Sequence, residues 1–363
     1  MLGSDASSTV HAVLCRAGMA TPDDRPSMAP LSGGVSSDIW RVEVASGVVC
    51  VKRALAKLKV EADWRAPLER SAFEAAWLET AARIVPEAVP RLLYYDRVAG
   101  ALVLPFLDPQ RYRVWKSELR DGRAEADVAA AVGERLARIH RATAIDRAIA
   151  ERFATDAIFH AIRLEPYLLA TARRHPDLAG ELERLVRRTA GTKLALVHGD
   201  ASPKNILVGP SGPVFLDAEC AWYGDPAFDL AFCLNHLFLK CLWNPGAVAG
   251  FLACFDALLE TYMALVSWEP RAALEARVAT LLPALLIARV DGKSPVEYLT
   301  EESEKDRVRR VARSFLKHPE RTLAPLRRAW AAEVGAGTPG VGPGPVAGLA
   351  GTPGREANGE GRR

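Results

Sequence analysis

Polar side chains that can bind a metal or move a proton lie in and around two short apolar runs, and this arrangement constrains the chain more than any other feature. The stretch LVHGDASPKNILVGPSGPVFLDAE runs from Leu196 to Glu219. It places Asp200 five residues before Asn205, and Asp217 at the end of the second apolar run. A surface hairpin needs only turn residues between its strands. The additional acidic and amide groups therefore predict a site for chemistry between two strands.

The spacing D-x-x-x-x-N, followed by an Asp after a strand, is the pattern of a phosphoryl-transfer site. A γ-phosphoryl group moves only when its charge is neutralised, and Mg²⁺ does this through oxygen ligands such as carboxylates and amides. We therefore expect Asn205 and Asp217 to bind Mg²⁺. We expect Asp200 to orient an acceptor hydroxyl and take its proton. A helix-capping Asp with polar turn residues is the alternative explanation.

Residues beside this motif have supporting roles in the same hypothesis. Lys204 either stabilises negative charge that develops on the phosphate or lies in solvent. Asp229, in the run GDPAFDLAF, is predicted to hold the loop through backbone N–H groups rather than to take part in chemistry. We assign His198 to the same structural support.

The residues upstream of the motif predict a small sheet with one helix. Apolar runs at Ile39–Val44 and Val48–Val51, joined by ASG, are typical of a β-hairpin. The segment Arg70–Ile84 has helical apolar spacing, and VPRLLYYDRVAGALVLPFLDP reads as two further strands. A phosphotransferase would bind its nucleotide on such a sheet.

Candidates for nucleotide binding follow from that arrangement. Lys52 comes directly after a strand and is expected to reach the α- and β-phosphates, held by Glu74 or, as a fallback, Glu69. The turn SGGVSS is expected to bring backbone N–H groups to the phosphates; its candidate residues are Gly33, Gly34 and Ser36.

The strand ALVLPFLDP, Ala101 to Pro109, is expected to form the hinge between two lobes and to bind adenine through its backbone near Leu104. Because Pro105 has no N–H, the donor is expected to be Phe106 or Leu107. The sequence does not distinguish ATP from GTP. A GxGxxG loop is absent, and Gly199 stands where an H-R-D loop has its Arg, so both features argue against a protein kinase.

Beyond residue 108 the chain is predicted to be mainly helical, apart from the short strands of the opening stretch. The expected fold class is therefore α+β, with a small β-rich N-lobe at 28–107 and a larger, mainly helical C-lobe at 108–334. Residues 1–27 are expected to form a helix and a loop. Residues 335–363 are rich in Gly and Pro and are expected to be a disordered tail.

Composition limits the remaining classes of function. A net charge of +3 over 363 residues is too weak a bias to argue for nucleic-acid binding. None of the six cysteines has CxxC spacing, and residues 1–27 lack the basic and apolar parts of a signal peptide, so we expect a cytoplasmic protein. The apolar run Phe228 to Trp243 contains Asp229 and Lys240 and is expected to be a buried helix rather than a membrane span.

The pieces LSGGVSSDIWRV, VCVKRAL, HGDASPKNILV, FLDAE and GDPAFDLA resemble the aminoglycoside phosphotransferase and choline kinase superfamily, over about residues 28–330. This resemblance implies a bilobal protein-kinase-like fold, ATP and Mg²⁺ as cofactors, and Asp200 as the catalytic acid/base residue. It also implies that Glu219 lies beside the metal or the acceptor. VKRALAKLKVEADW, VPRLLYYD and YRVWKSEL look like the 5-methylthioribose kinase-like branch, whose typical loop lacks the Asn seen here at Asn205.

The acceptor is expected to be the hydroxyl of a small sugar or sugar-like metabolite, with no nucleic acid or membrane as partner. Methylthioribose and an aminoglycoside antibiotic are the alternatives, and a catalytically silent nucleotide-binding scaffold is the alternative of another class. In LLIARVDGKSPVEYL, Arg289, Asp291 and Lys293 are candidates for the acceptor site. A structural alternative for the same segment is a helix C-cap with Gly292 in the left-handed conformation.

Overall fold

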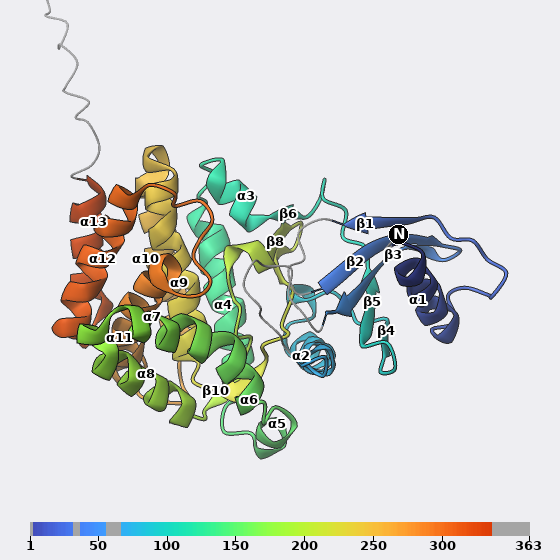
Figure 1. The fold of residues 1–363 in the computed structure, drawn as a ribbon, viewed down its shortest axis with the longest axis horizontal. Coiled ribbons are helices and arrows are strands. Elements are labelled where there is room, and N and C mark those ends of the chain that lie inside the picture. The colour runs from blue at the N-terminus through green and yellow to red at the C-terminus, as the bar shows by residue number, and fades with distance from the viewer. Residues whose placement is uncertain (1–2, 32–36, 56–66, 336–363) are drawn as a thin grey trace, which may run out of the picture.

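The computed structural model describes residues 3–31, 37–55 and 67–335. Figure 1 shows a small sheet with two helices at one end of the molecule and a larger group of helices at the other. This is the α+β arrangement expected from the sequence. Three residues of the predicted phosphate-binding turn, Gly33, Gly34 and Ser36, lie outside the described residues.

The five-stranded N-lobe sheet is antiparallel at every pairing and has the order β1-β2-β3-β5-β4. Its strands are β1 Met28–Leu31, β2 Ser37–Val44, β3 Gly47–Ala54, β4 Tyr94–Asp96 and β5 Ala101–Pro105. The predicted hairpin is present as β2 and β3. The edge strand β1 was not predicted, because MAPL is short, does not alternate and contains Pro30, which only an edge strand accommodates easily.

Successive side chains of β3 point to opposite faces of this sheet. Val49 and Val51 belong to a cluster with Val10 and Val13 of α1, Gly3–Arg16, so α1 covers one face. Lys52, one residue further on, therefore projects from the opposite face. Helix α2, Arg70–Ile84, has the bounds predicted from its periodicity and packs on that opposite face, between the sheet and the helical lobe (Figure 1).

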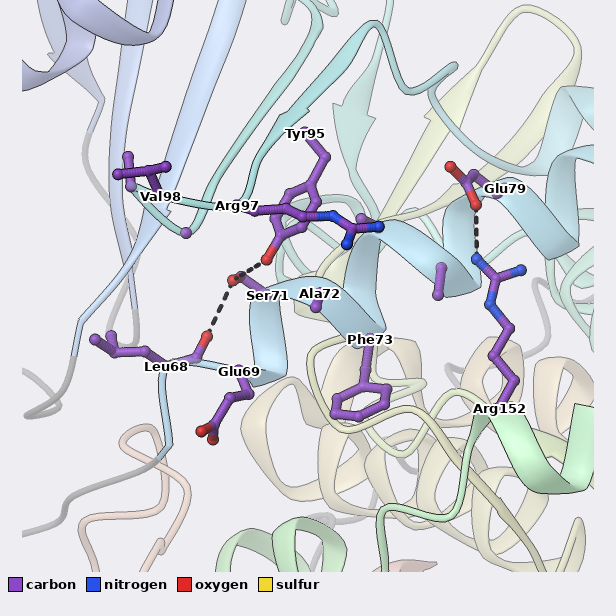
Figure 2. A pocket seen from close by; sticks show the side chains of 14 residues that line it. Leu68, Glu69, Ser71, Ala72, Phe73, Glu79, Tyr95, Arg97, Val98 and Arg152 are labelled. Atoms are coloured by element: carbon purple, nitrogen blue, oxygen red, sulfur yellow. Dashed lines mark hydrogen bonds and ion pairs between the residues drawn. The ribbon is translucent and has the colours of Figure 1, made fainter.

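A hollow of about 600 Å³ lies on the outer side of α2, between this helix and the turn that joins β4 to β5 (Figure 2). Its lining includes Phe73, Glu79, Tyr95 and Arg152. None of the residues proposed for chemistry lines it, apart from the fallback residue Glu69.

The C-lobe consists of helices and two small groups of strands (Figure 1). The helices are α3 Trp115–Arg120, α4 Ala126–Thr143, α5 Arg147–Arg152, α6 Asp156–Phe159, α7 Ala170–Arg174, α8 Ala179–Gly191, α9 Ala227–Trp243, α10 Val248–Leu265, α11 Arg271–Asp291, α12 Glu302–Lys317 and α13 Leu323–Gly335. The strands are β6 Arg113–Val114, β7 Ala195–Val197, β8 Ile206–Gly209, β9 Gly212–Phe215 and β10 Trp222–Gly224.

Residues 148–174, in the lobe predicted to be mainly helical, do not form one continuous helix. The carbonyl of Phe153 accepts a hydrogen bond from the Tyr223 N–H of β10, and the Thr155 hydroxyl donates to the Ala221 carbonyl. These tertiary bonds replace helical ones, so α5 ends before α6 begins. Downstream, His160–Leu169 forms a π-helical segment that contains Pro166.

Helix α9 occupies the middle of the C-lobe, and every residue from Ala227 to Leu242 is buried. A helix that is buried on all sides belongs to a protein core, so the expectation for this apolar run is confirmed. Within the described ranges, the segment Pro245–Leu265, which contains α10, is long and apolar enough to cross a membrane by length and composition alone. It packs against α4 and α9, and its exposed positions include Asp256 and Glu260.

Helices α4 and α10 approach each other unusually closely at one glycine. A Cβ atom added at Gly133 of α4 would lie 2.4 Å from the carbonyl oxygen of Leu258 in α10. Because heavy atoms do not approach so closely, only glycine permits this spacing.

Candidate active site

The hairpin of β8 and β9 brings Asn205 and Asp217 together, although 12 residues separate them in sequence. The pairing of Ile206 with Phe215 continues one step further, where the Leu216 N–H donates to the Asn205 carbonyl at 2.8 Å. Asp217 follows Leu216 directly and has a φ of 65°. A non-glycine residue in this left-handed region is uncommon and occurs preferentially at functional sites.

The backbone of the HGD loop, residues 198–205, is held by one buried carboxylate. Asp229 accepts hydrogen bonds from the N–H of His198 at 2.7 Å and from the N–H of Gly199 at 2.8 Å. Its Oδ2 atom also lies 3.2 Å from Nε2 of His140, whose Nδ1 lies 2.7 Å from the Tyr262 hydroxyl. Asp229 thus connects α9 to the loop, and α4 and α10 support it through His140 and Tyr262.

Gly199 occupies a position that no other residue fits without rearrangement. Its φ is 77°, and a Cβ there would lie 2.5 Å from the carbonyl oxygen of Cys220. The absence of an Arg at this position, noted in the sequence, therefore has a local steric cause.

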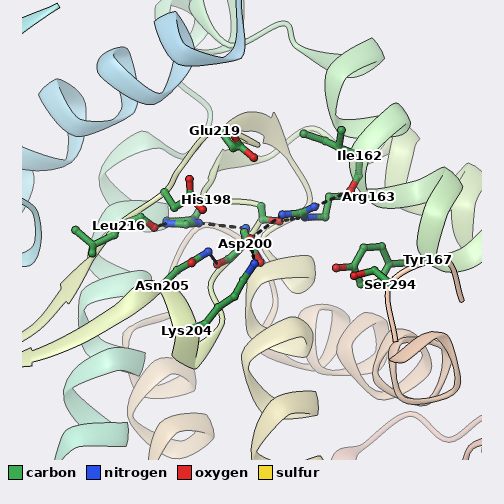
Figure 3. A network of polar contacts seen from close by, with 12 residues as sticks. Ile162, Arg163, Tyr167, His198, Asp200, Lys204, Asn205, Leu216, Glu219 and Ser294 are labelled. Atoms are coloured by element: carbon green, nitrogen blue, oxygen red, sulfur yellow. Dashed lines mark hydrogen bonds and ion pairs between the residues drawn. The ribbon is translucent and has the colours of Figure 1, made fainter. Parts of the chain in front are cut away.

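The imidazole of His198 connects the loop to the hairpin. Its Nε2 lies 3.1 Å from the Leu216 carbonyl, and its Nδ1 lies 3.1 Å from the Asp200 N–H (Figure 3). A ring that donates to a carbonyl and accepts from an N–H is the neutral form with its proton on Nε2. Burial lowers the pKa of His198 and favours the same neutral form.

Two cations flank the carboxylate of Asp200 (Figure 3). Nη2 of Arg163 lies 2.9 Å from Oδ2 of Asp200, and Nζ of Lys204 lies 3.2 Å from the same atom. Burial alone would raise the pKa of Asp200, but Arg163 and Lys204 outweigh it, and the pKa lies below its usual value. Asp200 is therefore ionised and can accept a proton.

Arg163 was not among the residues predicted from the sequence. It projects from the π-helical segment and also donates to the carbonyls of Gly199 and Ile162. Its only signal in the sequence is a charged residue between the apolar neighbours Ile162 and Leu164, and a single such residue does not reveal its partner.

Asn205 and Asp217 fit a magnesium site. The Asn205 amide donates to the Asp200 carbonyl at 3.1 Å, whereas its Oδ1 atom makes no hydrogen bond with any described group. Among the described residues no group of three or more His, Cys, Asp and Glu side chains forms a dedicated metal site. Mg²⁺ commonly takes only one or two protein oxygens, with substrate phosphates and waters completing its shell, so this sparse donor set is suitable.

Lys52 lies between two carboxylates. Its Nζ atom contacts both oxygens of Glu74 at 2.7 Å and also pairs with Asp217. The partner in α2 is therefore Glu74, and the fallback residue Glu69 is exposed. Burial raises the pKa of Glu74 to about 7. Burial also acts to raise the pKa of Asp217, but Lys52 and Lys204 hold it at about 2.

The family model for the phosphotransferase enzyme family matches residues 27–265. The chain belongs to this family.

Relatives and solved structures agree with this assignment. Methylthioribose kinase of Pectobacterium carotovorum is 27% identical over 263 residues, which cover 64% of this chain and 64% of that protein. The chain thus spans less than two thirds of that relative. A choline/ethanolamine kinase family protein from Mesorhizobium loti has a TM-score of 0.50 and 17% identity, covering 93% of this chain and 100% of that one.

Ethanolamine kinase of Plasmodium vivax has a TM-score of 0.54 and 11% identity over 85% of this chain and 88% of its own. These likenesses show the fold. They confirm the protein-kinase-like fold class, and the family match together with the methylthioribose kinase relatives confirms the superfamily resemblance inferred from the sequence.

In this phosphotransferase-family chain, Glu219 contacts α2. Its Oε2 lies 2.8 Å from Nε of Arg70, which is fully buried at the start of that helix. Arg70 also donates to the carbonyls of Pro67 and Leu55. Arg70 could not be predicted from the sequence, because 149 residues separate it from Glu219 and only the folded chain brings them together.

The prediction that the Phe106 N–H binds adenine at the hinge is wrong. The Phe106 N–H donates to the Val48 carbonyl at 3.2 Å, because the pairing of β3 with β5 extends one residue beyond Pro105. Phe106 therefore has no N–H free for adenine. Leu107, the other donor considered, makes no hydrogen bond with the described residues. Leu104 lies within β5, paired with Cys50.

The structure places the three acceptor-site candidates, Arg289, Asp291 and Lys293, in different surroundings. Arg289 is buried against Tyr167 and Ser294, whereas Asp291 binds His175 and Arg309. The side chain of Lys293 is exposed. The alternative of a left-handed C-cap is wrong, because Gly292 has a φ of −76°.

Proposed function

We propose that this chain is a kinase that transfers the γ-phosphoryl group of ATP, with Mg²⁺, to a hydroxyl of a small sugar-like molecule. The observation that carries this proposal is the Asp200 carboxylate, which Arg163 and Lys204 flank on the HGD loop beside the Asn205–Asp217 pair. An ionised carboxylate in that position orients an acceptor hydroxyl and takes its proton.

Other residues of the chain bind the nucleotide and the metal ion. Lys52, fixed by Glu74, binds the nucleotide phosphates, and Asn205 and Asp217 hold Mg²⁺. When bound, Mg²⁺ supplies charge neutralisation for the transferred phosphoryl group. Lys204 stabilises charge on the same group from the acceptor side. The Leu107 N–H is the hinge donor for the adenine base, in place of Phe106.

The sugar-like acceptor is supported by relatives named as methylthioribose kinases. Methylthioribose itself is the second candidate acceptor. Asn205 argues against methylthioribose, because the branch that the sequence resembles is expected to lack an Asn at this position.

The test compares wild type, Asp200→Asn and Asp256→Asn for ATP consumption with a panel of sugars, amino alcohols and aminoglycosides. Asp256 is a surface residue of α10 and serves as the control. Wild type and the control are expected to turn over at least one acceptor, and Asp200→Asn to lower kcat by about 10²- to 10⁴-fold.

Nucleotide binding is measured in parallel with Mg·ATP and Mg·GTP. Binding of Mg·ATP without turnover of any acceptor would favour the scaffold alternative. Failure to bind either nucleotide would overturn the proposal.

A further inference from the structure

Lys240 of α9 carries a buried amine without a counter-ion. The residue is 1% exposed. Its Nζ atom lies 4.0 Å from the ring centroid of Trp243 and 3.7 Å from that of Tyr298. It makes no hydrogen bond or ion pair with any residue in the described ranges. Aromatic faces offset part of the cost of burying an ammonium group, but they do not neutralise it.

Arg289 of α11 is a second buried basic group of this kind. It is 8% exposed, and its Nη1 donates to the Tyr167 hydroxyl at 3.2 Å and to the Ser294 hydroxyl at 3.1 Å. Its Nε atom is buried without a partner, as is the hydroxyl of Tyr298. No carboxylate of the described part of the chain pairs with Arg289. The two buried basic groups thus offer unused donor capacity.

His236 marks the centre of this group. It lies one helical turn before Lys240 and makes no hydrogen bond with the residues described. Burial and four charged neighbours lower its pKa well below the usual value, and all four are cations. We call these four residues the basic cluster: Lys116, Lys204, Lys240 and Arg289. Of them, Lys116 pairs with Glu297 and Lys204 with Asp200.

The basic cluster adjoins the proposed reactive carboxylate. The ring of Tyr167 joins the two, because Cζ of Arg289 lies 5.5 Å from its centroid and Cζ of Arg163 lies 5.7 Å from it. Arg163 in turn contacts Asp200. Figure 3 shows Tyr167 and Ser294 beside Arg163, Lys204 and Asp200.

A buried basic group without a carboxylate partner carries its charge only at a cost unless a ligand compensates it. We propose that the acceptor carries an acidic group, a carboxylate or a phosphate, in addition to the hydroxyl that is phosphorylated, and that Lys240 and Arg289 bind this group. The inference rests on the proposed function and names its substrate class. The Arg289 guanidinium disfavours cationic acceptors such as aminoglycosides and choline by repulsion.

The test measures binding separately from turnover. Isothermal titration is performed on the full chain, saturated with Mg²⁺ and a non-hydrolysable ATP analogue. The probes are ribose 5-phosphate, ribonate, ribose, methylthioribose and kanamycin. At least one of the two acids is expected to bind about 10- to 100-fold more tightly than ribose, as charge-assisted hydrogen bonds imply. The two acids distinguish a phosphate group from a carboxylate.

Variants connect that preference to the cluster. Lys240→Met and Arg289→Gln are each expected to remove the preference for the acid, while binding of ribose and of the nucleotide analogue stays unchanged. Arg289→Lys is expected to retain part of it. Lys317→Met, on the surface of α12, is the matched control. Unchanged nucleotide binding shows that each variant is folded.

Two results overturn the inference: ribose, methylthioribose or kanamycin binding as tightly as both acids, or an acid preference that survives both substitutions. Turnover of a neutral sugar that is insensitive to Lys240→Met would leave the proposed kinase function intact and refute only the acidic acceptor. Binding of an acid through Lys240 with no phosphoryl transfer would refute only the kinase function.

Discussion

The guanidinium of Arg163 lies 2.9 Å from the carboxylate of Asp200, and both side chains are almost fully buried. The two residues come from different elements, a π-helical segment and the HGD loop. Arg163 also donates to the Gly199 carbonyl, so it contacts the backbone and the side chain of the same loop. Arg163 is therefore a positioning residue for the proposed base.

We expect Arg163→Met to lower kcat by about 10- to 100-fold, because a charge-assisted bond to the carboxylate is lost. The KM for ATP should stay unchanged, since Arg163 contacts no residue proposed to bind the nucleotide. Arg163→Lys should recover part of kcat. The exposed Arg173 provides the control, Arg173→Met. Equal changes in kcat and in the KM for ATP would indicate a general structural defect instead.

Gly199→Ala should destabilise the protein and lower kcat together. The left-handed conformation alone costs a non-glycine residue about 1–2 kcal/mol, and the contact with Cys220 adds to this. Gly191→Ala is the matched control, because a Cβ at the end of α8 meets nothing within 4 Å. Urea unfolding measures the difference. Similar unfolding free energies for the two variants would contradict the steric argument.

The ion pair of Lys52 with Glu74 is expected to determine nucleotide affinity. Glu74→Gln replaces a carboxylate by a neutral amide, so Lys52 is held less firmly and Mg·ATP should bind about tenfold more weakly. Glu69→Gln alters an exposed residue near the start of the same helix and should have no effect. Fluorescence titration with a labelled ATP analogue measures both. Equal affinities would show that the pair does not position Lys52.

Lys240 should make stability depend on pH. Burial, Lys116 and Arg289 lower its pKa to about 6, and Glu297 only partly opposes them. The unfolded chain therefore binds a proton at Lys240 that the folded chain lacks between pH 6 and the ordinary lysine value. In this window the free energy of unfolding should rise with pH. Below about pH 6 the folded chain should bear the full cost of burying the charged Lys240 ammonium group.

Lys240→Met removes that cost, so we expect the variant to be more stable than wild type at pH 7 by about 1–4 kcal/mol. Its stability should also rise less steeply between pH 6 and pH 9. Thermal unfolding across this range measures both effects, with Lys317→Met as the control. A variant that is less stable than wild type at pH 7 would show that the aromatic contacts outweigh desolvation.

The sequence predicted most of the features that depend on local patterns. The bounds of α2 follow from its apolar periodicity. Glu74 follows as the partner of Lys52 because α2 is the first described element after β3. The β2–β3 hairpin follows in the same way, from alternation and a short turn.

Features that depend on strand register or on contacts between residues far apart in the sequence could not be predicted. The use of the Phe106 N–H depends on how far β3 pairs with β5, which no local pattern specifies. Arg163 reaches Asp200 only because a π-helical segment packs beside the HGD loop. Arg70 and Glu219 meet across 149 residues. The roles proposed for Asp200, Asn205, Asp217 and Lys52 remain predictions for experiment.

The close crossing of α4 and α10 at Gly133 determines more than core packing. His140 lies two turns beyond Gly133 on α4, and Tyr262 lies one turn beyond Leu258 on α10, so the helix separation sets the bond between these two side chains. The His140–Tyr262 bond orients the imidazole that contacts Asp229. Asp229 in turn fixes the position of the HGD loop through the N–H groups of His198 and Gly199. Gly133 therefore acts as a spacer for the proposed reaction centre, although within the described part of the chain it makes no hydrogen bond with the residues of that centre. A single methyl group in Gly133→Ala should reduce kcat while leaving nucleotide affinity unchanged, and steady-state kinetics with acceptor and ATP varied separately would detect it.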